Sequence, residues 1–279
     1  MGTVAGDSAV PHLFRMYSLQ KFYKGEGSSP DTTHSTVETY KLDGAAISLL
    51  YVDRCLVQAC TRGDGIAGQD ITDKILVLKC VPNNILIKGV VQVIGEVVAS
   101  KDITNSRNYA SGALNLKTVD EFLGREVTFY AYGIEGEGSC TYYTEDLVLL
   151  GKSGFNTVLS LKIGEPIPFP NDGIVVRINS NSVFKDKGYT SKHPRGAWAL
   201  KVRSKGTETT LVDVIWQVGK SGKVTPVAIL DPINIEGAVV GRATLNNTGF
   251  IKGLNLKIGD KVLVERAGGI IPRIMSKAI

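Results

Sequence analysis

The sequence contains few of the residues that bind zinc or form disulfides. Its 279 residues include four cysteines and three histidines, and no two cysteines form a CxxC pair. Structural zinc sites and disulfide scaffolds need closely spaced sets of these residues. We therefore expect no zinc, and we interpret the cysteines as small buried apolar residues in a reducing compartment.

Long apolar segments are also missing. The chain has no run of 18 apolar residues, which argues against a membrane span. Its first residues, MGTVAGDSAVPHLF, lack the basic segment and the apolar core of a secretion signal. These absences predict a cytoplasmic protein that does not contact a membrane.

Charge is distributed unevenly along the chain. The net charge of the whole sequence is a modest +5. Residues 185–279 hold 16 Lys and Arg against 7 Asp and Glu, a net charge of +9, whereas residues 1–184 carry −4. A basic C-terminal third fits contact with a polyanion such as nucleic acid, and it also fits a solubilising surface.

Short apolar runs rich in β-branched residues alternate with turn signals from residue 39 onward. This pattern, with few helical segments, is typical of an α+β domain with a mostly antiparallel sheet. The predicted strands are a hairpin around Asp53-Arg54, a strand pair within 85–100, and single strands at 126–134 and 172–179. Helices are predicted within 68–78 and 106–123, and a loop at 24–36.

The composition changes after about Lys205. Residues 209–245 and 256–274 contain short alternating strands separated by Gly and Pro. Several short strands at this spacing predict a small β-barrel, and an OB-fold is the natural candidate. We place the boundary near Arg203-Ser204, which gives one domain at 1–203 and a second at 204–279.

Several charged residues interrupt apolar strand patterns. Lys41 and Asp43 lie in TYKLDGAAISLLY (39–51). Asp, Glu and Lys are almost never fully buried unless they are paired or functional. Each alone also fits a strand end that reaches water, but five that converge on one cleft would form a reactive centre. The other three are Glu96 in QVIGEVVAS, Asp172 in DGIVVRIN and Lys201 in WALKVR.

Such a cleft would suit phosphoryl chemistry. A lysine amine attacks a phosphoryl group to form a phosphoramidate, and burial lowers the pKa of a lysine and makes it a better nucleophile. Carboxylates bind Mg²⁺, which neutralises charge on phosphates. Lys201, Arg62 and Arg107 would stabilise a transferring phosphoryl group. The segment around Arg62 also fits a plain β-turn, and the segment around Arg107 also fits a helix start.

These residues carry a family resemblance. KLDG at 41–44 resembles the KxDG nucleophile motif that ATP-dependent ligases, RNA ligases and capping enzymes share. Longer segments resemble NAD⁺-dependent DNA ligases, in the order found in that family, from about His12 to Ile274. The resemblance implies a nucleotidyltransferase (ATP-grasp-like ligase) domain followed by an all-β OB-fold barrel. The segments are HLFRMYSL (12–19), TRGDGIAGQDIT (61–72), SRNYASG (106–112), DGIVVRIN (172–179), TSKHPRGAWALKV (190–202), VGKSGKVTPVAIL (218–230), RATLNN (242–247) and IGDKVLVERAGGIIPRI (258–274).

The resemblance implies a role for each charged residue. Lys41 would carry AMP as a lysyl adenylate formed from NAD⁺, with Asp43 near the reaction centre. Glu96 would contact the ribose, and Asp172 and Lys201 would serve the phosphate chemistry. Asp172 and Glu96 would also bind Mg²⁺. Nucleotide contacts are further implied for Ser18, Leu19, Tyr132, Val175 and Arg177.

The implied substrate is nicked duplex DNA, and the protein would act on it inside the cell. The barrel would hold the duplex mostly through phosphates and groove shape, with little sequence preference. Arg62 would contact phosphate or DNA. Candidate DNA contacts are Arg107, Lys220 and Arg266.

Three residues depart from the pattern of the family. Thr39 stands where the family usually has a glutamate, two residues before the nucleophile. Asn115 replaces an expected arginine. Arg177 replaces a lysine, and we expect Arg177→Lys to cost little activity, although arginine is bulkier and keeps its proton. The region 144–170 is also short, which suggests a trimmed helix.

The matching segments do not include every domain that is usual in the family. Only about eleven residues precede the first matching segment. We therefore expect this chain to lack the helical domain that binds nicotinamide mononucleotide, and to lack zinc-finger, helix-hairpin-helix and BRCT modules. Either a second ligase subunit supplies the missing domain, or the chain is a fragment or degenerate core that seals only pre-adenylated nicks or merely binds DNA. A nucleotidyltransferase that uses ATP or GTP is the rival of a different class.

Overall fold

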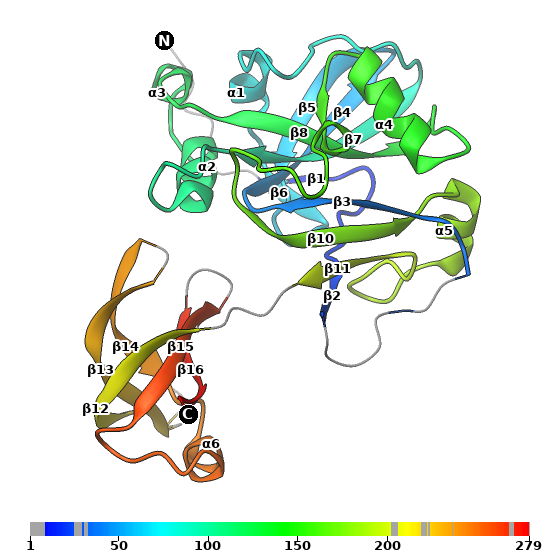
Figure 1. The fold of residues 1–279 in the computed structure, drawn as a ribbon. Coiled ribbons are helices and arrows are strands. Elements are labelled where there is room, and N and C mark those ends of the chain that lie inside the picture. The colour runs from blue at the N-terminus through cyan, green and yellow to red at the C-terminus, as the bar shows by residue number, and fades with distance from the viewer. Residues whose placement is uncertain are drawn as a thin grey trace. The chain divides into compact units, whose positions relative to one another are not determined.

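The computed structural model describes residues 9–24, 30, 33–201, 206–218, 222, 224–235, 237–267 and 271–278. The chain divides into two compact units, residues 1–202 and 203–279 (Figure 1). The boundary that the sequence predicts, at Arg203-Ser204, lies outside the described residues.

The first unit is built mostly from strands. Its strands are β1 (Ala9–Pro11), β2 (Gln20–Tyr23), β3 (Thr36–Leu42), β4 (Ala45–Val52), β5 (Cys55–Thr61), β6 (Ala67–Gln69), β7 (Val90–Val98), β8 (Thr128–Gly136), β9 (Asn156–Thr157), β10 (Asn171–Ile178) and β11 (Ala197–Lys201). Its helices are α1 (Thr72–Leu76), α2 (Ser106–Leu114), α3 (Val119–Leu123), α4 (Tyr143–Lys152), the 3₁₀ turn η1 (Val158–Ser160) and α5 (Asn181–Lys187).

These strands form two larger sheets and one small one. The orders are β5-β4-β7-β8-β9, β2-β11-β10-β3 and β1-β6. Most neighbours are antiparallel, while β11 with β2 and β8 with β9 are parallel. In Figure 1 the four-stranded sheet lies below the five-stranded sheet. The two sheets form two layers of the unit.

The core of the first unit lies on one face of the five-stranded sheet. Side chains alternate between the two faces of a strand. In β7 the buried residues Val91, Val93 and Val97 share one face, where Ala110 of α2 and Leu147 of α4 join the same apolar cluster. The opposite face of β7, which carries Glu96, therefore points away from these helices.

The sequence predicts most of these elements correctly. The hairpin around Asp53 and Arg54 is confirmed, with both residues at positive φ in the turn between β4 and β5. The one or two short helices predicted within 106–123 are found as two, α2 and α3. The predicted strand pair at 85–100 is wrong, because only β7 is a strand there. Its partners are β4 and β8, which lie far away in the sequence.

The second unit is a closed barrel with strand order β12-β13-β14-β16-β15. The strands are β12 (Thr207–Val218), β13 (Val224–Ile235), β14 (Ala238–Thr244), β15 (Lys261–Ala267) and β16 (Ile271–Lys277), and α6 (Thr248–Gly253) follows β14. Leu211, Ala228, Leu230, Val262 and Val264 belong to its buried apolar core. An α+β unit with mostly antiparallel sheets followed by an all-β barrel confirms the predicted fold class.

The four cysteines are free thiols. Cys60 is buried as predicted, but the prediction is wrong for Cys55, which is exposed because it begins β5 directly after the surface turn at residues 53–54. Among the described residues, no helix has the length and apolar composition that a membrane crossing requires.

Candidate active site

Lys41, Asp172 and Lys201 meet on three adjacent strands. Asp172 lies in β10, between β3 with Lys41 and β11 with Lys201. Its Oδ1 is 2.9 Å from Lys41 Nζ, and Lys201 Nζ donates to its Oδ2 at 2.5 Å. Burial alone would raise the pKa of Asp172, but the two lysines outweigh burial and hold this pKa below its usual value. Asp172 is therefore an anion shared by two cations.

A local irregularity in β10 brings Asp172 between the lysines. The pairing of β10 with β3 shifts between Asn171 and Ile174, and Gly173 has φ 140°. A Cβ at Gly173 would collide with the carbonyl oxygen of Leu200 in β11. Glycine is therefore required here for β10 to approach β11 while turning Asp172 toward both lysines.

The turn after β3 links the nucleophile motif to Glu96. The backbone N–H of Gly44 donates to Glu96 Oε1 at 3.1 Å, and a Cβ at Gly44 would collide with the carbonyl oxygen of Val97. Burial raises the pKa of Glu96 to about 7, although Lys41 and the Gly44 N–H oppose the shift. Glu96 thus titrates near neutral pH at the edge of the Lys41 site.

Asp43 and Arg107 form an ion pair beside this turn. Arg107 Nη1, in the first turn of α2, lies 2.9 Å from Asp43 Oδ1. Burial raises the pKa of Asp43, and Arg107 opposes that shift. The helix start that carries Arg107 therefore brings a guanidinium next to the nucleophile motif.

Arg62 is held near Glu96 by the N-terminal segment. His12 is buried, and its Nε2 lies 2.9 Å from the backbone oxygen of Arg62 while its Nδ1 lies 2.8 Å from Ser48 Oγ. Burial is the main cause that raises the pKa of Tyr132. The charge of Glu96 raises this pKa further, and the charge of Arg62 opposes the shift. Arg62, Glu96 and Tyr132 are therefore electrostatic neighbours.

Besides Tyr132 of β8, the predicted base contacts lie in β10 and in the segment before β2. Val175 pairs with Thr39 in β3 and with Ala199 in β11, so it shares the face of the four-stranded sheet that carries Lys41. Ser18 is exposed, and its backbone N–H donates to the Lys192 carbonyl at 3.2 Å. Leu19 is half-buried and leads directly into β2, which pairs with β11.

Arg177 is enclosed at the other end of that face. Its guanidinium carbon lies 4.1 Å from the ring centres of both Tyr143 and Phe184. Nη2 donates to Asn181 Oδ1 at 2.8 Å, and Nη1 donates to the Ile178 carbonyl at 3.2 Å. Burial lowers the pKa of Arg177. Two aromatic rings therefore lie against the group that the sequence predicts at the adenine.

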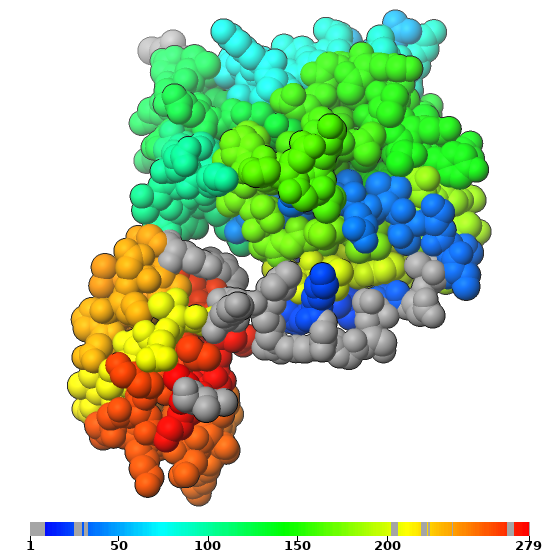
Figure 2. Space-filling model, viewed as in Figure 1, coloured from blue at the N-terminus to red at the C-terminus, as the bar shows by residue number. Residues whose placement is uncertain are grey.

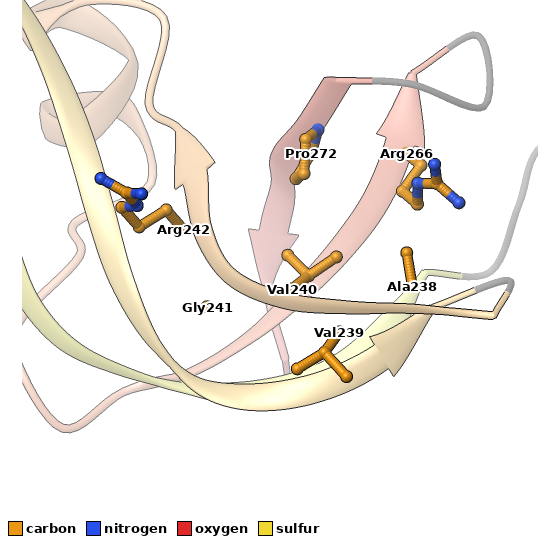
Figure 3. Close-up of a pocket in the computed structure, with 7 residues that line it drawn as sticks. All are labelled: Ala238, Val239, Val240, Gly241, Arg242, Arg266 and Pro272. Atoms are coloured by element: carbon orange, nitrogen blue, oxygen red, sulfur yellow. The ribbon is translucent and has the colours of Figure 1, made fainter.

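The barrel carries the remaining predicted contacts. Arg266 in β15 lines a hollow with Arg242, and Figure 3 shows the two guanidinium groups at opposite ends of it. The hollow is also lined by Ala238, Val239, Val240, Gly241 and Pro272. Lys220 lies outside the described residues. The sequence reasoning missed Arg242, although it lies in the quoted segment RATLNN.

Two further residues near the site were missed from the sequence. Tyr143 begins α4, donates its hydroxyl to the Tyr132 carbonyl at 2.9 Å, and forms a side-chain hydrogen bond with Thr39. Lys21 lies in β2, within the electrostatic surroundings of Lys201 and Lys41. No sequence signal pointed to either, because both reach the site only through the folding of distant segments.

Comparisons with known proteins agree on one family. Residues 6–167 match the model of the NAD-dependent DNA ligase adenylation domain, and residues 208–279 match that of the NAD-dependent DNA ligase OB-fold domain. The first match alone covers more than half of the chain.

Curated relatives are named DNA ligase. Identity is 32% with the protein of Sulfurihydrogenibium sp. (strain YO3AOP1), over 95% of this chain and 46% of the relative. It is 33% with that of Oceanobacillus iheyensis, over 97% and 46%, and 34% with that of Campylobacter jejuni, over 95% and 47%. The chain spans about half the length of these relatives.

Proposed function

Because this chain belongs to the NAD-dependent DNA ligase family, we propose that it is the core or a subunit of an NAD⁺-dependent DNA ligase. Lys41 takes AMP from NAD⁺, the AMP passes to the 5′-phosphate of a nick, and the 3′-hydroxyl then displaces it and seals the strand. The observation that carries this proposal is the contact of Lys41 and Lys201 with the single carboxylate of Asp172.

The Lys41–Asp172–Lys201 arrangement suits the first step. The side chain of Lys41 is only 25% exposed, and that of Lys201 is 15% exposed. Asp172 holds the Lys41 amine in one place, which reduces the entropy cost of its attack on phosphorus. Lys201 lies in β11, on the other side of β10 from Lys41. Its positive charge would stabilise charge on the phosphate during transfer.

Two carboxylates fit the Mg²⁺ that the family implies. Oδ1 of Asp172 is buried, and apart from its ion pair with Lys41 it has no hydrogen-bond partner among the described residues. The described residues also contain no group of three or more His, Cys, Asp or Glu that could hold an ion. Mg²⁺ commonly binds through one or two carboxylates together with substrate phosphates, which suits Asp172 and Glu96. When bound, it would neutralise charge on the phosphates.

The nucleotide would lie on the face of the four-stranded sheet that carries Val175 and Lys41. We assign the ribose to Glu96, which already accepts the Gly44 N–H. We assign the adenine to Tyr132 and Val175, with Ser18 and Leu19 at its edge. Because rings cover Arg177, this arginine supports the wall of the pocket rather than stacking on the base.

DNA would be bound mainly through its phosphates. Arg62 and Arg107 lie beside the nucleophile motif, where the 5′-phosphate of a nick would enter. Arg266 on the barrel and Lys220, which the sequence alone suggests, are further contacts, and basic side chains of this kind bind duplexes with little sequence preference. The protein would thus act inside the cell on nicked duplex DNA, together with a second subunit that supplies the domain for nicotinamide mononucleotide.

Labelled NAD⁺ tests this function. The chain is incubated with NAD⁺ labelled in its adenylate, alone and with candidate partner chains, and then offered nicked and pre-adenylated duplexes. We expect a covalent AMP adduct and sealing of both duplexes. Sealing of pre-adenylated nicks without any adduct would indicate a degenerate core. Neither adduct nor sealing would leave only DNA binding and would overturn the ligase proposal.

A further inference from the structure

A third lysine lies on the same sheet face as Lys41 and Lys201. β2 runs parallel to β11, with Lys21 opposite Ala199 and Tyr23 opposite Lys201. Residues in register point to the same side of a sheet, so Lys21 and Lys201 are diagonal neighbours. Such neighbours lie roughly 7–8 Å apart, within the reach of long side chains. Figure 2 shows the blue N-terminal segment at the surface beside the yellow-green residues near position 200.

The charges around Lys21 are unbalanced. Lys201, Lys41 and Arg107 all lie in its surroundings, with Asp172 as the nearby carboxylate. Asp172 is already shared by two lysines, and among the described residues Lys21 forms no ion pair of its own. Burial, followed by the neighbouring cations, lowers the pKa of Lys21. A cation in such a position gains from an added anion.

In the first step, the second anion beside the α-phosphate is the other phosphate of NAD⁺; in the later steps it is the 5′-phosphate of the nick, which the sealing of pre-adenylated nicks tests separately. The α-phosphate of NAD⁺ must reach Lys41, and Lys201 and Asp172 already serve that position. The other phosphate of NAD⁺ belongs to the leaving nicotinamide mononucleotide, and its negative charge grows as the bond between the two phosphates breaks. A cation beside the Lys41–Lys201 pair would stabilise that charge.

We propose that Lys21 binds the phosphate of the leaving group. In this step Lys41 Nζ, a cation in its ion pair with Asp172, first gives one proton to solvent, and the lone pair of the neutral amine then forms the N–P bond. The bond from the α-phosphorus to the bridging oxygen breaks, the oxygen leaves with the electron pair on the second phosphate, and Nζ loses a second proton to solvent. This inference rests on the proposed function, and it adds a residue specific to the first step.

Binding measurements separate the two phosphates. Calorimetry compares AMP with ADP-ribose, which carries the second phosphate but no nicotinamide. For Lys21→Gln we expect ADP-ribose to bind roughly tenfold more weakly, with AMP unchanged within twofold. Lys21→Arg should keep most of the affinity. The matched control is Lys152→Gln, which removes the same charge from an exposed position in the last turn of α4; it should change neither affinity.

Kinetics distinguish this inference from the function on which it rests. In single turnover, Lys21→Gln should slow lysyl-AMP formation by roughly 10- to 100-fold, yet seal pre-adenylated nicks at the rate of the unchanged protein. De-adenylation of the lysyl-AMP form should also lose sensitivity to added nicotinamide mononucleotide, with inorganic pyrophosphate as the comparison. Equal weakening of AMP and ADP-ribose, or no weakening, would overturn the role of Lys21. Absence of lysyl-AMP in the unchanged protein would instead overturn the proposed function.

Discussion

One face of the four-stranded sheet holds charged side chains at both ends. The two ends differ in the partners that surround these charges. At the phosphate end, Lys41, Lys201 and Lys21 surround Asp172 and leave positive charge in excess. At the arginine end, Arg177 is covered by two rings and satisfied by Asn181 and a backbone carbonyl.

The difference indicates that charged residues at one end of the sheet serve the reaction, whereas those at the other end stabilise the fold. Both ends place a cation within an apolar framework, but only the arginine end supplies enough neutral partners to satisfy it. At the phosphate end, two lysines contact the same carboxylate of Asp172, and Lys21 adds a further cation, so we expect this end to favour an anionic ligand. We therefore expect substitutions at the phosphate end to change chemistry and those at the arginine end to change stability.

The largest expected effect is on activity at the phosphate end. Asp172→Asn removes the anion between Lys41 and Lys201, so lysyl-AMP formation should fall roughly 100-fold or more. The lowered pKa of Asp172 also gives stability that is present above its unfolded value of 3.8 and is lost as the pH falls below it. Quench-flow kinetics and melting curves at pH 7 and pH 3 measure both. Full activity in the variant would contradict the assignment.

The next largest effect tests the arginine end. Arg177→Lys loses the planar group that both rings contact and one of the two directed hydrogen bonds, so it should destabilise the protein by about 1–2 kcal/mol. Denaturant unfolding measures this against Arg195→Lys, an exposed control. The sequence led us to expect little loss of activity from Arg177→Lys, and the ring contacts add to this an expected loss of stability. Equal stability of both variants would show that the rings contribute nothing.

Glu96 sharpens the comparison because it is a carboxylate without an ion pair of its own among the described residues. Its pKa rises from 4.5 to about 7 on folding, so the protonated form is favoured in the folded state. Stability is therefore present below pH 4.5 and is lost as the pH rises to about 7. Glu96→Gln should be more stable than the unchanged protein by about 3 kcal/mol above pH 7, and equal to it near pH 4.

The same variant should lose activity, because the neutral amide oxygen of glutamine accepts a hydrogen bond from a ribose hydroxyl more weakly than a carboxylate does. Thermal melts from pH 4 to pH 8 and the KM for NAD⁺ test the two halves of this prediction. A stability difference that does not vary with pH would rule out Glu96 as the titrating group.

The smallest effect concerns the ion pair of Arg107 with Asp43. Arg107 is 43% exposed, and ion pairs at such positions contribute little to folding. Arg107→Ala should change the free energy of unfolding by less than about 1 kcal/mol, while nick binding weakens. A filter-binding assay measures nick binding, with Lys152→Gln as the control for the lost charge. If Arg107→Ala binds nicks as well as this control does, Arg107 does not contact DNA.

Much of the fold could be predicted from local patterns. The turn at Asp53 and Arg54, the helices at α2 and α3, and the barrel strands follow from alternation and turn residues close together in the sequence. The partners of β7 could not be predicted in this way, since β4 and β8 reach it through tertiary packing. The strand pair predicted within 85–100 therefore does not form, because both partners of β7 come from distant segments.

The candidate site divides along the same line. Lys41, Glu96, Asp172 and Lys201 could be singled out because charge within an apolar strand is unusual. Lys21 could not, because its significance arises from pairing between β2 and β11, which lie far apart in the sequence. The rings around Arg177 come from α4 and α5, which the strand-rich pattern did not predict.

The most direct test of this account is the site of AMP attachment. The protein is incubated with adenylate-labelled NAD⁺, alone and with candidate partner chains, digested, and mapped by mass spectrometry. We predict one labelled lysine, Lys41, and no label in Lys41→Ala, whose melting temperature should stay close to that of the unchanged protein. Label on Lys201 or Lys21, or an undiminished adduct in Lys41→Ala, would contradict the account.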